Sequence, residues 1–125
     1  MTKTNLVVLA VDDDLINLKL LKSMLMKSGK VKEVIEAKNG SDAIGELKAR
    51  NDIDLILLDI IMPIMGGIDM LKVVRADDNL RQLPILVLTT DETKKAEALE
   101  CGANGFLMKP IRNEELFKKI ATVII

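Results

Sequence analysis

The chain has 125 residues, a net charge of −1, one cysteine and no histidine, and these values exclude several classes of protein. The length fits one domain with a buried core, and the charge lacks the basic surplus of a nucleic-acid-binding surface. Without histidine there is no Ser-His-Asp triad, no Cys-His pair and no usual zinc ligand set. A single cysteine excludes an internal disulfide, so we expect a cytoplasmic protein.

Five short apolar segments alternate with segments of helical character. The expected strands are residues 6–11, 31–37, 55–58, 85–88 and 106–108. The expected helices are residues 15–27, 42–50, 68–75, 92–100 and 113–124. Leu18, Leu21 and Leu25 recur at the spacing of one helix face, and Ser41 and Asn113 mark two expected helix starts. Apolar strands that alternate with helices indicate a parallel sheet with helices on both faces, here one domain over residues 1–125. No apolar run is long enough to span a membrane.

Four of the five expected strands end on residues suited to phosphate or metal chemistry. In an open α/β sheet the ligand site lies at the carboxyl ends of the strands. These residues are, in chain order, Asp12, Asp13 and Asp14, then Asp59, then Thr89 and Thr90, and finally Lys109. Their convergence on one edge of the sheet carries more weight than any one of them alone.

Asp12, Asp13 and Asp59 are expected to lie within a few ångströms of one another. Their mutual repulsion would raise at least one pKa, and a hard divalent cation relieves it. Mg²⁺ suits a site with few carboxylates, several waters and a phosphate oxygen. The alternative for residues 12–14 is a polar turn that caps the following helix, a role that fits Asp14 best.

Asp59 follows four apolar residues and, taken alone, could simply begin a turn. Together with the acids after the first strand it becomes a candidate nucleophile, because an ionised carboxylate can attack phosphorus to form an acyl phosphate. Phosphoryl transfer requires mainly positioning and charge neutralisation. Mg²⁺ and Lys109 would supply the charge, and Thr89 a hydrogen bond to a phosphoryl oxygen.

The chain resembles the response-regulator receiver domains of two-component signalling over nearly its whole length. The motifs that carry the resemblance are Val11-Asp12-Asp13-Asp14, Leu58-Asp59-Ile60-Ile61-Met62-Pro63 with Gly66-Gly67, Leu88-Thr89-Thr90, and Gly102-Ala103 leading through Gly105-Phe106 to Lys109-Pro110. Each motif is weak alone, and together in this order they are highly specific. The resemblance implies a flavodoxin-like (βα)5 fold, a doubly wound five-stranded parallel sheet of order 2-1-3-4-5.

By this resemblance Asp59 is the phosphoacceptor, and its donor is a phosphohistidine on a histidine kinase or a histidine phosphotransfer protein. The implied cofactor is Mg²⁺, held by Asp12, Asp13, Asp59 and the backbone carbonyl of Ile61. Such a domain catalyses only its own phosphorylation and the hydrolysis of its aspartyl phosphate. We therefore expect a signalling protein and not a turnover enzyme, with no direct contact to nucleic acid or membrane.

The resemblance also implies a switch. Thr89 moves toward the phosphoryl group, Phe106 follows it, Lys109 contacts the phosphate, and the Lys109-Pro110 peptide bond is cis. From the residues alone, segment 92–100 is a weakly anchored helix whose only sizeable apolar residue is Leu99, and an ordinary surface helix fits it equally well. Its position between Thr89 and Phe106 favours the switch, with residues 92–125 as the face read by a downstream effector protein or a fused output domain.

Four positions depart from, or tune, the family pattern. Gly66 stands where an acidic residue is frequent, Thr90 stands where a small residue is frequent, and Ile61 and Asp91 stand where the family adjusts the lifetime of the acyl phosphate. The direction of that adjustment does not follow from the sequence. We therefore make no prediction of the lifetime.

Two alternatives to a phosphoacceptor domain remain. An aspartate-nucleophile phosphatase places its nucleophile after the first strand, where Asp12 and Asp14 have the Asp-x-Asp spacing, but it leaves Asp59 without a role. A pseudo-receiver that binds partners without phosphorylation does not need the complete set of acids, threonine and lysine that this chain carries. Sustained turnover of unrelated phosphomonoesters would favour the phosphatase, and the absence of any phosphoryl adduct would favour the pseudo-receiver.

Overall fold

The computed structural model of the chain describes residues 4–124 and contains one five-stranded parallel sheet of order β2-β1-β3-β4-β5. The order and the parallel pairing confirm the predicted doubly wound α/β fold. Residues 1–3 and 125, which the expected domain and output face include, lie outside the described residues. The strands are β1 (Leu6–Val11), β2 (Val31–Ala37), β3 (Leu55–Asp59), β4 (Ile85–Thr89) and β5 (Gly105–Met108).

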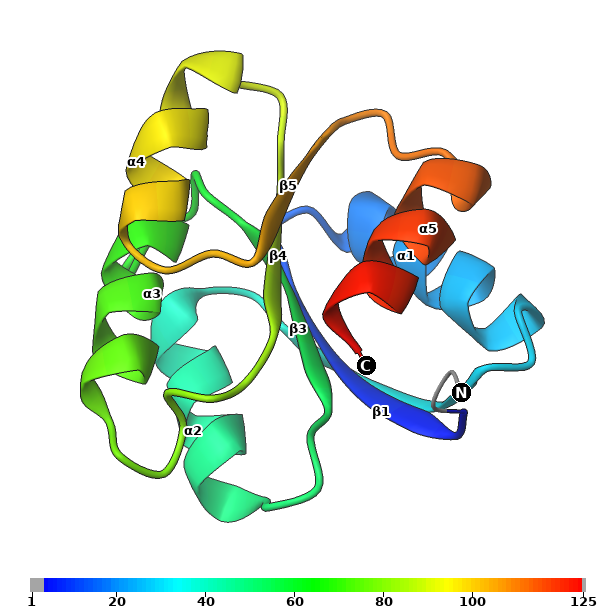
Figure 1. Cartoon of the computed structure of the whole chain (residues 1–125), viewed down its shortest axis with the longest axis horizontal. Coiled ribbons are helices and arrows are strands. Elements are labelled where there is room, and N and C mark those ends of the chain that lie inside the picture. Colours follow the sequence, from blue (N-terminus) through cyan, green and yellow to red (C-terminus); the bar gives the residue numbers. More distant parts are fainter. Residues whose placement is uncertain (1–3, 125) are drawn as a thin grey trace.

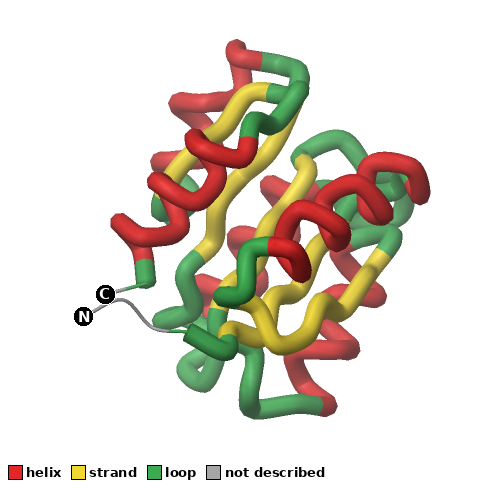
Figure 2. Tube along the Cα trace, turned by 90° about the vertical axis from the view of Figure 1, so that its right-hand side faces the viewer, coloured by secondary structure: helices red, strands yellow, loops and turns green. Residues whose placement is uncertain are grey.

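Helices cover both faces of the sheet. Figure 1 shows α1 and α5 on one face and α2, α3 and α4 on the other, and Figure 2 shows the strands as a layer between the helices. Among the described residues, none of these helices is long and apolar enough to cross a membrane. The helical segments are α1 (Leu15–Lys27), α2 (Gly40–Ala49), α3 (Gly67–Ala76), the 3-10 helix η1 (Glu92–Lys94), α4 (Lys95–Glu100) and α5 (Asn113–Val123).

The central strands are buried at every position because both of their faces are covered. Successive residues of a strand point to opposite faces, so Val7 and Leu9 join the core beneath α2 and α3, and Leu6 and Val8 join the core beneath α1 and α5. The leucines predicted to form the inner face of the first helix are buried in α1, namely Leu18, Leu21 and Leu25.

One of the two marked helix starts differs from the sequence prediction. The cap of α2 is Asn39, whose side chain accepts a hydrogen bond from the Asp42 N–H (2.8 Å), and Ser41 lies inside the helix. Ser41 is one of two residues suited to cap this helix, and Asn39 lies at the point where the backbone is still extended. The other marked start is confirmed, because Asn113 is the first residue of α5, and the capping residue before it, Arg112, forms no side-chain bond.

The expected helix over residues 92–100 is divided into η1 and the short helix α4. Leu99 does not anchor it, because 42% of that residue is exposed, and Ala98 is the buried residue of α4. The segment therefore buries even less apolar area than its sequence indicated. Few buried side chains therefore hold it against the sheet.

Candidate functional site

The carboxyl ends of β1, β3, β4 and β5 meet at one edge of the sheet. The pairing of Val11 with Leu58 places the next residue of each chain segment at the same level, so Asp12, directly after β1, and Asp59, the last residue of β3, become neighbours. Asp59 in turn pairs with Leu88, and Thr89 with Met108, which brings the end of β5 to the same edge. The predicted convergence of polar strand ends is therefore present in the structure.

Three carboxylates form the centre of this edge. Asp12, Asp13 and Asp59 each offer one oxygen atom, and these atoms all lie within 4.8 Å of one another. Asp12 and Asp59 are buried, and Asp13 is exposed to solvent. Asp14 does not join them, because its side chain accepts hydrogen bonds from the Ile16 and Asn17 N–H groups and caps α1, as predicted. The cluster that the sequence predicted is confirmed in its membership.

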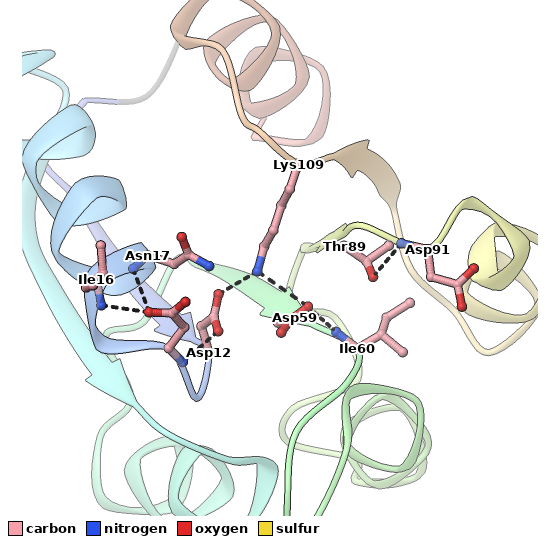
Figure 3. Close-up of polar contacts among 9 residues, drawn as sticks. Asp12, Ile16, Asn17, Asp59, Ile60, Thr89, Asp91 and Lys109 are labelled. Carbon is pink, nitrogen blue, oxygen red and sulfur yellow. Dashed lines mark hydrogen bonds and ion pairs between the residues drawn. The ribbon is translucent and has the colours of Figure 1, made fainter.

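Lys109 extends from the end of β5 toward the carboxylates (Figure 3). Its Nζ lies 2.7 Å from Asp12 Oδ2 and 3.6 Å from Asp59 Oδ1. Three ionised carboxylates and one ammonium give a formal charge of −2, so Lys109 neutralises only part of the cluster. The peptide bond between Lys109 and Pro110 is cis, as the resemblance implied.

The pKa of Asp59 is raised from 3.8 to about 6. Burial of the carboxylate is the largest cause, and the charges of Asp12 and Asp13 raise the pKa further, whereas Lys109 and the Ile60 N–H lower it. The Ile60 N–H donates to Asp59 Oδ1 (2.9 Å), the same oxygen that faces Lys109. Within the described residues Oδ2 accepts no hydrogen bond, which leaves one carboxylate oxygen free to act as a nucleophile.

This donor set fits a Mg²⁺ ion. Mg²⁺ prefers oxygen ligands, binds through few carboxylates and retains several waters, and the cluster offers carboxylate oxygens from Asp12, Asp13 and Asp59 with a surplus of negative charge. The side chain of Ile61 is exposed two residues after Asp59. Its backbone carbonyl remains a predicted ligand.

Thr89 ends β4 with its side chain buried at this edge. Its hydroxyl oxygen accepts a hydrogen bond from the Asp91 N–H (3.2 Å), and the hydroxyl proton has no acceptor among the described residues (Figure 3). The Asp91 carboxylate in turn accepts from the Thr93 N–H (3.0 Å) at the start of η1. Two hydrogen bonds through Asp91 thus link the Thr89 hydroxyl to the segment that begins with η1.

Phe106 is part of the core on the α2 and α3 side, which fits the plain core role as well as the switch role. It also lines a surface recess of about 500 Å³ on the predicted output face. Met108 lies in the same recess and is 37% exposed. Charged residues of both signs surround this apolar floor, namely Glu92, Lys95, Glu115, Lys118 and Lys119.

Gly67 supports the site in a way that the sequence analysis did not recognise. Its N–H donates to the Ile60 carbonyl (2.8 Å), and a Cβ atom at this position would overlap the Asp59 carbonyl oxygen and lie 2.8 Å from Ile60 Cα. Only glycine allows the start of α3 to pack this closely beneath Asp59. The Gly66-Gly67 pair was visible as a motif, and that pair was the available signal.

A second feature that the sequence did not reveal is a recess of about 360 Å³ beside the carboxylates. Asp12 and Lys109 form its polar end. The remaining lining is largely apolar and comes from α1, from Leu88 of β4 and from the residues after β5. Its apolar residues in α1 and after β5 are Leu20, Leu21, Met24, Pro110 and Ile111. The Lys109 side chain therefore lies at the polar end of a recess whose other walls are mostly apolar.

The fold and the site define a class of protein: a parallel α/β domain that presents a buried aspartate, two further acids, a threonine and a lysine at one sheet edge. The family model of the response regulator receiver domain matches residues 8–121, and the chain belongs to that family. The chemotaxis protein CheY1 of Helicobacter pylori is 36% identical over 119 residues, which cover 93% of this chain and 94% of that protein.

Solved structures give the same assignment. The chemotaxis response regulator CheY4 of Vibrio cholerae is 35% identical, with a TM-score of 0.86 over 96% of this chain and 99% of that one. The receiver domain of a sensor histidine kinase from Pseudomonas aeruginosa is 27% identical, with a TM-score of 0.86 over 97% of this chain and 98% of that one. That structure was determined with a magnesium ion coordinated in the active site cleft.

Proposed function

We propose that Asp59 accepts a phosphoryl group from a phosphohistidine on a histidine kinase or histidine phosphotransfer protein, with Mg²⁺ as cofactor. The observation that carries this proposal is the placement of a buried Asp59 within 4.8 Å of the Asp12 and Asp13 oxygens and 3.6 Å from the Lys109 ammonium. An isolated turn-forming aspartate has no need of these neighbours. The magnesium ion in the Pseudomonas receiver domain supports the choice of cofactor.

In the transfer, Asp59 Oδ2 attacks phosphorus, a P–O bond forms, and the bond from phosphorus to the donor nitrogen breaks. Asp59 must be ionised for this step, and a pKa of about 6 leaves it mostly ionised at neutral pH. Bound Mg²⁺ supplies positive charge to the phosphoryl oxygens, and Asp12, Asp13, Asp59 and the carbonyl of Ile61 would hold it. The Lys109 side chain, 3.6 Å from Asp59 Oδ1, provides the second positive charge.

Thr89 connects the phosphoryl group to the output face. Its hydroxyl proton is free to donate to a phosphoryl oxygen, while its oxygen still accepts from the Asp91 N–H. We infer that this new bond draws Thr89 and Asp91 toward the site and shifts η1 and α4. Phe106 and the recess on the face of residues 92–125 would then present a changed surface to an effector or a fused output domain.

A protein donor fits the surroundings of the site better than a small phosphate ester does. Large apolar side chains are exposed on both sides of Asp59, namely Leu15 (50%) and Ile16 (72%) at the start of α1 and Ile61 (61%) and Ile64 (85%) after β3. Exposed apolar groups gathered near a reactive centre are typical of protein interaction surfaces. The proposal also assigns the domain to the cytoplasm, consistent with a free Cys101, and treats it as a phosphoacceptor that is not a turnover enzyme.

The alternatives receive less support from the structure. A phosphatase with its nucleophile in the Asp12-x-Asp14 motif needs both carboxylates at the reaction centre, and the Asp14 carboxylate is engaged in capping α1. A pseudo-receiver gives no reason to bury Asp59 beside two other acids, an arrangement that raises its pKa. Both alternatives nevertheless make predictions that differ from those of a phosphoacceptor.

One experiment separates the three functions: incubation with Mg²⁺ and acetyl phosphate, followed by intact mass and released-phosphate measurements. We expect a stoichiometric, Mg²⁺-dependent phosphoryl adduct that is absent in Asp59→Asn. Asp54→Asn is the matched control, because Asp54 is an acid at the opposite edge of the sheet, bonded to the Val7 N–H, and this variant should keep the adduct. Sustained turnover of unrelated phosphomonoesters would favour the phosphatase, and the absence of any adduct would favour the pseudo-receiver.

A further inference from the structure

The Arg75 side chain, near the end of α3, joins three segments at the edge of the sheet opposite to Asp59. Its Nε donates to the Gly102 carbonyl (3.0 Å), and its Nη1 donates to the carbonyls of Arg81 (2.9 Å) and Leu83 (2.8 Å). Its Nη2 donates to Asn104 Oδ1 (2.9 Å). Among the described residues Arg75 forms no ion pair, so every acceptor of this cation is a neutral oxygen.

Asn104 extends this connection to the start of β4. Its Oδ1 also accepts from the Ile85 N–H (2.8 Å), and its own N–H donates to the Ile85 carbonyl (2.8 Å). One amide oxygen is thus shared by the Arg75 guanidinium and a strand N–H. The end of α3, the loop through residues 81–83, the first residue of β4 and residues 102–104 therefore form one hydrogen-bonded unit.

The backbone at Gly102 is shaped around the same side chain. Gly102 has φ +107, a conformation that residues with a Cβ rarely adopt. A Cβ atom placed there would lie 2.8 Å from Arg75 Cγ and 2.9 Å from Arg75 Nε. Gly102 thus leaves room for the Arg75 side chain to reach its carbonyl, and the two residues are adapted to each other.

Residues 102–104 are the last part of a segment whose first part is held far less firmly. The segment over residues 90–104, which we call the switch segment, begins at the site with η1, in which no residue is buried. Lys94, at the capping position of α4, makes no side-chain cap bond, and Ala98 is the buried residue of that helix. Figure 1 shows α4 beside α3, so the helix that carries Arg75 is the support against which the switch segment rests.

We propose that Arg75 is an anchor that fixes residues 102–104, so that the switch segment responds to phosphorylation at its first half and turns about its fixed end. A charged donor with several neutral acceptors gives strong hydrogen bonds, and their removal loosens the attached loop. Fixing one end converts a displacement near Thr89 into a directed movement of α4 and not into local unfolding. The movement rests on the proposed function, whereas the anchoring is a property of the resting protein.

Single-residue hydrogen exchange by NMR tests the anchor, with and without Mg²⁺ and beryllofluoride as a phosphoryl mimic. In the resting protein, the Gly102 and Asn104 amides should exchange at least about tenfold more slowly than those of Thr93 and Lys94. Arg75→Lys keeps the charge but cannot reach all four acceptors, and it should speed exchange at residues 102–104 by about tenfold, the effect of losing hydrogen bonds to a charged group. In the wild type, beryllofluoride should change the exchange rates only in the first half of the switch segment. In Arg75→Lys it should change them in both halves.

Two further variants separate anchoring from general destabilisation. Arg81→Lys is the matched control, because the exposed Arg81 side chain has only a 3.9 Å ion pair with Asp78, and it should leave all these rates unchanged. Asn104→Ala removes the shared acceptor without altering Arg75, and it should speed exchange at residues 102–104 as Arg75→Lys does.

Several outcomes would overturn the anchor. One is equal protection from exchange in the two halves of the switch segment in the wild type. Another is that Arg75→Lys speeds exchange of the Leu9 amide in β1 as much as that of residues 102–104, because the Leu9 amide reports global unfolding. A response of residues 102–104 to beryllofluoride in the wild type would also contradict it. If beryllofluoride changes exchange nowhere, the proposed function fails, and the resting exchange rates still decide the anchor.

Discussion

The two edges of the sheet hold their polar groups in opposite ways. At the carboxyl edge, three carboxylates share one ammonium, and Asp59 keeps a free oxygen and a raised pKa. At the amino edge, the Arg75 guanidinium has four acceptors, and Asp54 accepts a hydrogen bond from the Val7 N–H. The first edge has charge and hydrogen-bonding capacity left over, and the second has its polar groups satisfied.

The difference indicates that the carboxyl edge is suited to bind a ligand and that the amino edge stabilises the fold. Buried polar groups without partners reduce stability, so an unbalanced cluster persists where a ligand or a reaction uses it. A satisfied polar network instead fixes the segments that it joins. The carboxyl edge is therefore expected to gain stability when its charges are removed, and the amino edge to lose stability when its bonds are removed.

The largest expected effect concerns the close packing beneath Asp59. Gly67→Ala should lower the free energy of unfolding by about 3 kcal/mol or more, because the new Cβ meets backbone atoms of Asp59 and Ile60 that cannot move aside cheaply. Urea denaturation measures the change. Gly45→Ala is the control, since a Cβ at this position in α2 meets nothing within 4 Å and should raise stability by up to about 1 kcal/mol. Equal stability of the two variants would show that the backbone beneath Asp59 yields easily.

The second effect is the stability cost of the Asp59 charge. The folded-state pKa of about 6 lies above the ordinary value of 3.8, so the folded protein binds the proton more tightly than the unfolded chain. The contribution of Asp59 to stability should therefore fall as pH rises from about 4 to about 6 and then remain low. Without divalent cations at pH 7.5, the free energy of unfolding of Asp59→Asn should be higher than that of the wild type by roughly 2 to 3 kcal/mol. This gain in stability should vanish near pH 4.

Urea denaturation across this pH range measures that gain, and added Mg²⁺ provides the control. Mg²⁺ bound to the native wild type should stabilise it and narrow the difference from Asp59→Asn. A stability difference that is the same at pH 4 and pH 7.5 would show that the Asp59 charge does not cause it.

The parallel sheet and the membership of the site could be predicted from the pattern of residues, whereas the order of the strands was implied by the resemblance to receiver domains. Apolar strands alternating with helices require a parallel sheet, and parallel strands bring their carboxyl ends together. This reasoning is enough to place Asp12, Asp59 and Lys109 at one edge, where the structure has them. It uses only the order of the residues along the chain and the direction of the strands.

Features that depend on the path of the backbone could not be predicted in the same way. The bonds of Arg75 go to carbonyl groups whose direction is set by loops, and an arginine in a helix gives no sign of them. The burial of Ala98 in place of the larger Leu99 follows from the rotation of a six-residue helix, which is too short for its pattern to define a face. Asn39 and Ser41 were both suited to cap α2, and only the backbone angles distinguish them.

A third and smaller effect is expected in the loop that follows Asp59. Ile64 has φ +67, which is unfavourable for a β-branched residue, and its side chain is 85% exposed. Ile64→Asn should raise the free energy of unfolding by about 1 kcal/mol, because asparagine adopts this conformation more readily. Ile61→Asn, an exposed isoleucine in the same loop, should change stability by less than about 0.5 kcal/mol. If Ile64→Asn also slows transfer from a protein donor but not from acetyl phosphate, the strain is retained for docking.

The smallest effect tests whether satisfied polar groups stabilise wherever they occur. Arg50 bonds both oxygens of Glu33 (2.9 Å each) and also pairs with Asp52 (2.8 Å), and the hydrogen bond from Arg50 lowers the pKa of Glu33. These groups are open to solvent, where water and salt screen such pairs. Arg50→Gln should lower Tm slightly in dilute buffer and match the wild type in about 1 M NaCl, whereas the loss in Arg75→Gln should persist in salt. If both losses disappear in salt, the amino edge is held by surface charge, and its contrast with the carboxyl edge no longer stands.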